Sequence, residues 1–249
     1  MGLLPTEKSK IKTDNPKNLI IFGLPKAGKT TVLSKLENNL IVDLENGSDY
    51  ISGYTVKAQN YVDLFKIAKA LKEEEHQFKF VTLDTVTALE DIAIPYACKK
   101  MKEANPSFSG NPDDLFNVPY GAGYSAHRNA GKEIIGWFKS VAENIILVGH
   151  VKEKSLNEEG TELNVKQLDL GGKLSSILAA DSDAICYVYR DLESGNLMAN
   201  FGDLNSVLTG ARVPHLAGKT ITLAEKIIKD DNNYDLLTHW DTIYPSLKK

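Results

Sequence analysis

Short apolar runs alternate with amphipathic stretches through the first half of the chain. Three runs have the length of buried strands and cover residues 19–22, 40–42 and 78–83. Between the last two runs, apolar side chains recur at helical spacing, at Tyr61, Leu64, Phe65, Ala68 and Leu71. Strands joined by helical crossovers predict an α/β fold with a mainly parallel sheet flanked by helices, which binds ligands at the carboxyl ends of its strands.

The second half of the chain predicts a different kind of strand pairing. Helices are expected over about 86–101 and around 134–138, followed by a strand over 144–148. Three later apolar runs follow one another too closely for helical crossovers, at residues 184–189, 197–201 and 220–223. We therefore expect an antiparallel C-terminal edge on the parallel sheet.

Turn-forming residues and changes in composition predict how the chain is divided. Polar residues, lysines and prolines dominate its start, and glycine, proline, asparagine and acidic residues mark two later interruptions. The predicted parts are a flexible N-terminal arm over 1–16 and a single domain over 17–249, which contains an exposed loop over 105–119, a hairpin over 151–169 and a C-terminal extension over 224–249.

Composition excludes several classes of function. The 249 residues carry a formal net charge of −4, so the surface as a whole is not built to hold nucleic acid, and any such contact is local. No stretch approaches the roughly 20 apolar residues that cross a bilayer, so we expect a cytoplasmic protein without a membrane partner. Cys98 and Cys186 lack the spacing of a zinc site or a disulfide framework, and we expect buried free thiols.

The segment that follows the first apolar run carries the most specific signal. Gly23 to Thr30 fill every fixed position of the pattern G-x-x-x-x-G-K-[ST], whose backbone N–H groups converge on the phosphates of a nucleoside triphosphate. Glycine permits that close approach. Lys29 is expected to reach the β- and γ-phosphates, and the Thr30 hydroxyl is expected to hold Mg²⁺. The predicted nucleotide-binding residues are Gly23, Leu24, Pro25, Lys26, Ala27, Gly28, Lys29, Thr30 and Thr31.

Asp84 ends the third apolar run, where a second nucleotide motif places an acidic residue. We expect its carboxylate to share the Mg²⁺ with Thr30. The alternative is that Asp84 only caps the helix that follows, as aspartate often does.

Hydrolysis also requires a group that orients or deprotonates water. Glu45 is the candidate, because it follows the second apolar run and no carboxylate follows Asp84 directly. Asp43 is expected to support the site or to cap a turn. The alternative is that Asp43, Glu45 and Asp49 form a solvated acidic loop.

His150 follows the apolar run at 145–149, at the same expected edge of the sheet. A polar side chain there can hydrogen-bond the γ-phosphate or the attacking water and pass the presence of the nucleotide to the following hairpin. With Glu45 and Lys29, it completes the predicted catalytic set. An imidazole in this place can equally be a satisfied structural group, and the sequence leaves both interpretations open.

The order of these residues resembles the RecA-like branch of phosphate-loop ATPases, in which the carboxylate after the second strand is catalytic. A closer likeness is to the compact RecA-core proteins of bacteriophages, which include recombination and single-strand annealing ATPases. That likeness adds four segments: 120–124, 150–154, 172–174 and 212–219. It covers roughly residues 18–223, although only the phosphate loop is highly specific.

The resemblance implies a Mg²⁺-dependent ATPase, in the host cytoplasm if a phage encodes it, that assembles into a filament or ring with nucleotide between neighbouring subunits. It also implies a basic group supplied in trans, for which the candidates are Lys173, Arg212 and Lys219. Single-stranded DNA would contact residues 151–174. That segment holds four lysines against five carboxylates, a net charge of −1, so we expect weak DNA binding or binding only through assembly.

Two other functions stay open at this stage. The protein could be a non-catalytic switch that uses bound ATP to fix a conformation or a partner surface, with 105–119 as its contact. A small-molecule kinase would share the phosphate loop, but the long middle excursion contains no arginine for a lid. A GTPase is disfavoured because the chain has no Asn-Lys-x-Asp run to recognise guanine.

Overall fold

The computed structural model describes residues 4, 13–158, 161–202, 207–230 and 233–248. Most of the predicted N-terminal arm over 1–16 lies outside these ranges, as do residues 159–160 of the predicted hairpin. No helix in the described ranges is both long and apolar enough to span a bilayer.

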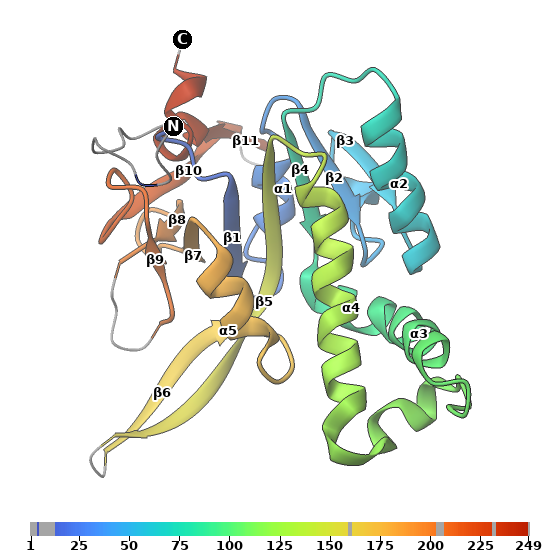
Figure 1. Cartoon of the computed structure of the whole chain (residues 1–249). Coiled ribbons are helices and arrows are strands. Elements are labelled where there is room, and N and C mark those ends of the chain that lie inside the picture. Colours follow the sequence, from blue (N-terminus) through green and yellow to red (C-terminus); the bar gives the residue numbers. More distant parts are fainter. Residues whose placement is uncertain (1–3, 5–12, 159–160, 203–206, 231–232, 249) are drawn as a thin grey trace.

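One large sheet runs through the described part of the molecule (Figure 1). Its parallel strands, in the order in which they lie side by side, are β3 (Tyr54–Lys57), β2 (Asn39–Asp43), β4 (Phe80–Asp84), β5 (Asn144–Glu158), β1 (Asn18–Gly23) and β7 (Ala184–Arg190). Because these strands are parallel, their carboxyl ends meet at the same edge of the sheet.

Antiparallel strands extend the sheet beyond β7. They are β8 (Leu197–Asn200), β10 (Thr220–Asp230) and β11 (Asn233–Thr238), with the short β9 (Gly210–Ala211) also paired to β7. The outer part of β5 leaves the sheet and pairs with β6 (Thr161–Leu168) in a projecting hairpin (Figure 1). The predicted fold class, a mainly parallel sheet with an antiparallel C-terminal edge, is confirmed.

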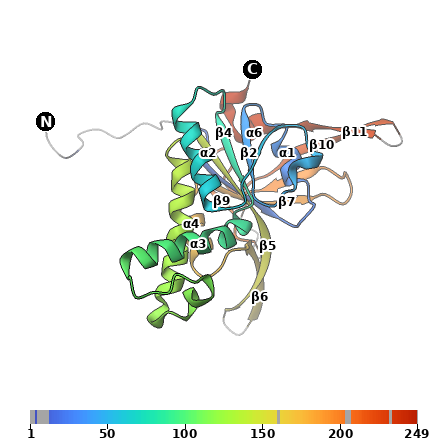
Figure 2. The same ribbon diagram turned by 90° about the vertical axis from the view of Figure 1, so that its right-hand side faces the viewer.

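Helices cover both faces of the parallel part. One face carries α2 (Tyr61–Glu73), α3 (Val86–Ala104), α4 (Ala122–Lys139) and α5 (Leu174–Asp181), and the other carries α1 (Lys29–Leu33) and α6 (Trp240–Ile243) (Figure 2). Successive strand residues point to opposite faces, so Ile20 and Phe22 join the first core and Leu19 and Ile21 join the second. Burial on both faces explains why the strands read as continuous apolar runs.

The helix that follows the phosphate loop is short and covers only Lys29–Leu33. It ends at Leu33, although Leu36 is also buried. The Asn39 side chain donates a hydrogen bond to the Leu33 carbonyl at 2.9 Å and satisfies one of the carbonyls that the helix end leaves free.

The segment 105–119 is mostly exposed, but it is attached to the body through two apolar side chains. It contains a short 3₁₀ helix over Pro112–Asn117, and the side chains of Phe108 and Leu115 are buried in the core between the sheet and α3 and α4. Phe108 and Leu115 attach an otherwise exposed segment to the body. The sequence did not indicate their burial, because polar and turn-forming residues surround both.

The C-terminal extension packs on the body of the molecule. Trp240 is buried and its indole N–H donates to the Val32 carbonyl at 3.0 Å, while Tyr244 is completely buried against Phe80. These contacts join the last residues to α1 and to the start of β4. Cys98 and Cys186 are buried free thiols.

Candidate functional site

The strand register brings polar residues together at the carboxyl edge of the sheet. Gly23, the last residue of β1, is level with His150 of β5. Asp84, the last residue of β4, is level with Asp43 of β2 on one side and with Val148 of β5 on the other. The chain segments that leave β1, β2, β4 and β5 therefore surround one site.

The phosphate loop has a conformation that its glycines permit. Gly28 has a φ of +105°, and Lys26 adopts the left-handed region with a φ of +62°. A Cβ added to Gly23 would lie 2.4 Å from the Val188 carbonyl oxygen of β7, so only glycine fits there. The requirement for glycine at position 23 thus comes from the neighbouring strand as well as from the expected approach of phosphate.

Lys29 is folded back into the loop. Its Nζ donates to the carbonyl oxygens of Gly23 at 3.0 Å and Leu24 at 2.9 Å, and the residue is only 6% exposed. Burial lowers the pKa of Lys29, and the negative charges of Asp84 and Glu45 oppose that change. The ammonium is therefore held by neutral acceptors, which an anionic ligand can replace with a stronger, charge-assisted interaction.

Thr30 and Asp84 form the arrangement expected of a Mg²⁺ site. The Thr30 hydroxyl donates to Asp84 Oδ2 at 2.6 Å across the gap between α1 and β4. Burial raises the pKa of Asp84, and the hydrogen bond from Thr30 works in the opposite direction. A cation held by these two residues would stabilise the buried carboxylate.

The residues present fit Mg²⁺ together with nucleotide. In the described ranges, no group of three or more His, Cys, Asp and Glu side chains could hold a metal ion alone. Mg²⁺ commonly takes one or two protein ligands and completes its shell with phosphate oxygens and water. Thr30 and Asp84 beside a phosphate loop supply that donor set.

Asp43 builds the turn that carries Glu45. Its buried carboxylate accepts hydrogen bonds from the backbone N–H groups of Glu45 at 3.0 Å, Gly47 at 3.3 Å and Ser48 at 2.9 Å. Burial alone would raise the pKa of Asp43, but these hydrogen bonds together with one from the Ser48 side chain lower it. Asp43 is therefore a buried turn residue and not part of a solvated acidic loop, whereas Glu45 and Asp49 lie at the surface, with 39% and 64% of their side chains exposed.

Glu45 Oε1 connects two strand ends. It accepts a hydrogen bond from the Thr85 hydroxyl at 2.6 Å and lies 3.0 Å from Nε2 of His150. Thr85 is buried and also caps α3 by accepting from the Ala88 N–H at 3.2 Å. Nothing local in the sequence indicates that the Thr85 hydroxyl holds Glu45.

His150 has one nitrogen in use and one without a partner. Its Nδ1 is buried and, among the described residues, has no hydrogen-bond partner. The His150 backbone N–H donates to the Thr87 hydroxyl at 3.1 Å, and its carbonyl accepts from the Asp169 N–H at 2.8 Å at the base of the hairpin. His150 therefore contacts both Glu45 and the root of the β5–β6 hairpin.

The three basic residues proposed to act in trans lie away from this cluster in the chain itself. Arg212 donates to the Ala180 carbonyl and faces Asp183 at 4.0 Å, beside the amino end of β7. The phosphate loop follows the carboxyl end of β1, at the opposite edge of the sheet. Lys173 precedes α5 and Lys219 precedes β10. Within the described ranges, no hydrogen bond or ion pair joins any of the three to the phosphate loop of its own chain.

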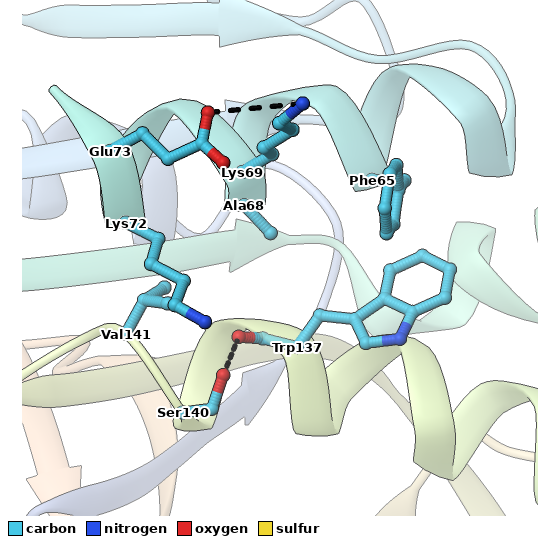
Figure 3. Close-up of a pocket in the computed structure, with 8 residues that line it drawn as sticks. All are labelled: Phe65, Ala68, Lys69, Lys72, Glu73, Trp137, Ser140 and Val141. Carbon is cyan, nitrogen blue, oxygen red and sulfur yellow. Dashed lines mark hydrogen bonds and ion pairs between the residues drawn. The ribbon is translucent and has the colours of Figure 1, made fainter.

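A groove between α2 and α4 is also distant from the site. Figure 3 shows its lining, in which Phe65 and Trp137 face each other and Lys69 pairs with Glu73. The carboxyl ends of α2 and α4 precede β4 and β5, so much of this groove lies toward the amino ends of those strands. It takes no part in the cluster of strand ends.

Comparisons with known proteins show the family of this chain but do not test its individual site residues. A search of curated proteins gives no match. Among solved structures, the chain is similar to one described as the crystal structure of the RadB recombinase, with 14% sequence identity, a TM-score of 0.43, and coverage of 85% of this chain and 88% of that chain. This likeness is too distant to inform function. The family model described as "AAA domain" matches residues 15–222, and the chain therefore belongs to the AAA-domain family.

Proposed function

We propose that the protein is a RecA-like, Mg²⁺-dependent ATPase. The observation that supports this most strongly is the meeting of four predicted residues at one sheet edge, where the Thr30 hydroxyl lies 2.6 Å from Asp84 Oδ2 and Glu45 Oε1 lies 3.0 Å from His150 Nε2. The phosphate loop supplies the backbone donors and Lys29 supplies the charge for a triphosphate. Thr30 and Asp84 would hold Mg²⁺, which when bound neutralises developing charge on the phosphates.

Glu45 is proposed to be the hydrolytic carboxylate. It would orient a water molecule and accept its proton as the water oxygen bonds to the γ-phosphorus and the bond to ADP breaks. Its carboxylate is fixed by Thr85, and its backbone is fixed by Asp43. Such prior fixing matters because phosphoryl transfer depends mainly on positioning and on charge stabilisation.

We further propose that the ATPase works in phage-type DNA recombination and assembles as a filament or ring on single-stranded DNA. The support is that β5 passes directly from the site into the projecting hairpin, with His150 at the transition. A change at Glu45 can therefore reach the hairpin through one side chain. Lys173, Arg212 and Lys219 remain the candidates for a basic group that acts on a neighbouring subunit.

The test is ATP hydrolysis by the purified protein, measured at low salt with and without single-stranded DNA. We expect Mg²⁺-dependent turnover that DNA stimulates. If the protein hydrolyses ATP but single-stranded DNA neither binds to it nor stimulates turnover, the recombination role is refuted and the ATPase role stands. Stoichiometric ATP binding without turnover would refute the ATPase role and favour a nucleotide-dependent switch.

A further inference from the structure

Arg190 lies against the phosphate loop, although its distance in sequence gives no sign of this. It ends β7, which lies directly beside β1 with Val188 level with Gly23. A Cβ added to Gly28 would come within 2.9 Å of the Arg190 Nη2 atom. The guanidinium therefore faces the loop residue that directly precedes Lys29.

The turn between β7 and β8 holds the guanidinium in this place. Arg190 Nη1 donates to the Gly195 carbonyl at 3.1 Å. The turn is itself closed by Asp191, whose carboxylate accepts from the Ser194 N–H at 2.8 Å and the Ser194 hydroxyl at 2.6 Å. The Gly195 N–H in addition donates to the Asp191 carbonyl at 2.9 Å. A short, internally bonded turn thus anchors one side of the side chain and leaves Nη2 directed at the loop.

The charge of Arg190 is not neutralised by the protein that surrounds it. Among the described residues, no carboxylate forms an ion pair with its guanidinium, and the nearby Asp191 carboxylate is bonded to Ser194. Arg212 differs, because it faces Asp183. Lys26 and Lys29 belong to the same loop, so Arg190 adds a third basic residue to it, and this excess of positive charge favours a polyanion.

We propose that Arg190 binds the phosphate tail of the nucleotide in its own subunit. This inference rests on the proposed ATPase function and adds a residue to it. The planar fork of a guanidinium suits paired phosphate oxygens, and its anchored position reduces the entropy lost on binding. The phosphate site therefore receives an arginine in cis, whether or not a neighbour also supplies one.

The first test compares binding of fluorescent ATP and ADP analogues, with Mg²⁺, to the wild type and to Arg190→Ala, Arg190→Lys and Arg128→Ala. Arg128 is the control, since it lies on α4 and its guanidinium bonds to Ser125. We expect Arg190→Ala to weaken triphosphate binding by about 10- to 100-fold, the effect of losing a charged hydrogen bond. Arg190→Lys should recover part of the affinity, and Arg128→Ala should match the wild type.

The outcomes separate this inference from the proposed function. If the wild type binds ATP and Arg190→Ala binds it equally well, the inference is wrong and the ATPase proposal stands. If the wild type binds no ATP, both are wrong. Circular dichroism of each variant checks that folding is retained, and Arg190→Lys keeps the test valid should Arg190→Ala fail to fold.

Subunit mixing distinguishes action in cis from action in trans. Arg190→Ala is mixed with Lys29→Ala, whose own phosphate loop is disabled but whose Arg190 is intact. If Arg190 serves its own subunit, ATP turnover in the mixture equals the sum of the two separate activities. A gain well above that sum would show that Arg190 serves a neighbour and would overturn the proposal.

Discussion

The two halves of β5 have opposite surroundings. Residues 144–148 lie between the parallel strands β1 and β4, and Ile146, Leu147 and Val148 are completely buried. From Val151 onward the same strand pairs only with β6, and residues 153–155 are exposed. A single strand thus joins a rigid part of the core to a projecting arm, and His150 occupies the junction.

The difference locates the proposed coupling between nucleotide and hairpin. The inner half cannot shift without disturbing packing on both faces of the sheet. The outer half is fixed mainly at its root, where the Asp169 N–H donates to the His150 carbonyl at 2.8 Å and Lys152 pairs with Asp169 at 3.2 Å. A change in the Glu45–His150 contact would therefore act on the root of the hairpin and leave the core strand in place.

Removing the ammonium of Lys29 should have the largest effect on ATP hydrolysis, because Lys29 is a buried charge at the site beside the inner half of β5. We expect Lys29→Ala to lower kcat/KM for ATP by about 10³-fold or more, because the charge contributes to both ground-state and transition-state binding. Steady-state ATP hydrolysis measures the effect. Loss of less than about tenfold would mean that the triphosphate does not bind at this loop.

Replacing Glu45 should separate binding from hydrolysis. Glu45→Gln keeps the size and the hydrogen bond from Thr85 but cannot accept a proton, so we expect kcat to fall by about 10²–10³-fold while ATP affinity changes little. Asp49→Asn is the control, because Asp49 is an exposed acid of the same loop that pairs with Lys57. Normal turnover by Glu45→Gln would dismiss Glu45 as the hydrolytic carboxylate.

His150 is expected to matter more for stimulation by DNA than for basal turnover. In His150→Ala we expect basal ATP hydrolysis to change by less than about tenfold, while most of a stimulation of about fivefold or more, typical of coupled sites, is lost. Turnover is measured across a titration of single-stranded DNA. Full stimulation in this variant would show that the signal takes another route.

The chain offers a matched control for that variant. His239 lies 3.0 Å from Glu225 on the antiparallel edge, the same separation as between His150 and Glu45. His239→Ala removes an equivalent contact far from the strand ends that form the site. It should leave both basal and DNA-stimulated turnover unchanged.

The smallest expected effect concerns stability rather than catalysis: without Mg²⁺ or nucleotide, Asp84→Asn should make the folded protein more stable. Burial raises the pKa of Asp84, so at pH 7 the folded protein carries a buried carboxylate at a cost. Without Mg²⁺ or nucleotide, the variant should melt about 2–4 °C above the wild type, the shift produced by about 1 kcal/mol in a domain of this size. Thermal unfolding followed by circular dichroism measures the difference.

The pH dependence checks the cause of that difference. As pH falls through the raised pKa of Asp84, the folded wild type takes up a proton before the unfolded chain does, and its stability increases relative to the variant. The difference in Tm should therefore shrink as pH falls from about 7 toward about 4, where the ordinary carboxyl group also titrates. A constant difference would show that burial of charge is not its origin.

The sequence was most informative where chemistry and strand order coincide. Gly23, Asp84, Glu45 and His150 each follow an apolar run, and the carboxyl ends of parallel strands meet at one edge, so their convergence follows from the alternating pattern. The catalytic and metal-binding roles of these residues stay predictions.

Other parts of the molecule depend on contacts that no local pattern contains. Arg190 faces Gly28 only because β7 pairs with β1 across a long stretch of sequence, and Thr85 meets Glu45 because β4 lies beside β2. The short strand β3 is exposed at three of its four residues and carries no continuous apolar run, and α5 begins only a few residues after the hairpin ends. The contacts of Arg190 and Thr85 therefore depend on the pairing of strands that are distant in sequence, which the sequence alone did not predict.

The most direct test of the central claim is titration calorimetry of the wild-type protein with a nonhydrolysable ATP analogue, performed with Mg²⁺ and again with a chelator. The account predicts one nucleotide bound per chain, with affinity that falls markedly when Mg²⁺ is removed, because Thr30 and Asp84 hold the ion. No binding, or binding that is indifferent to Mg²⁺, would contradict it.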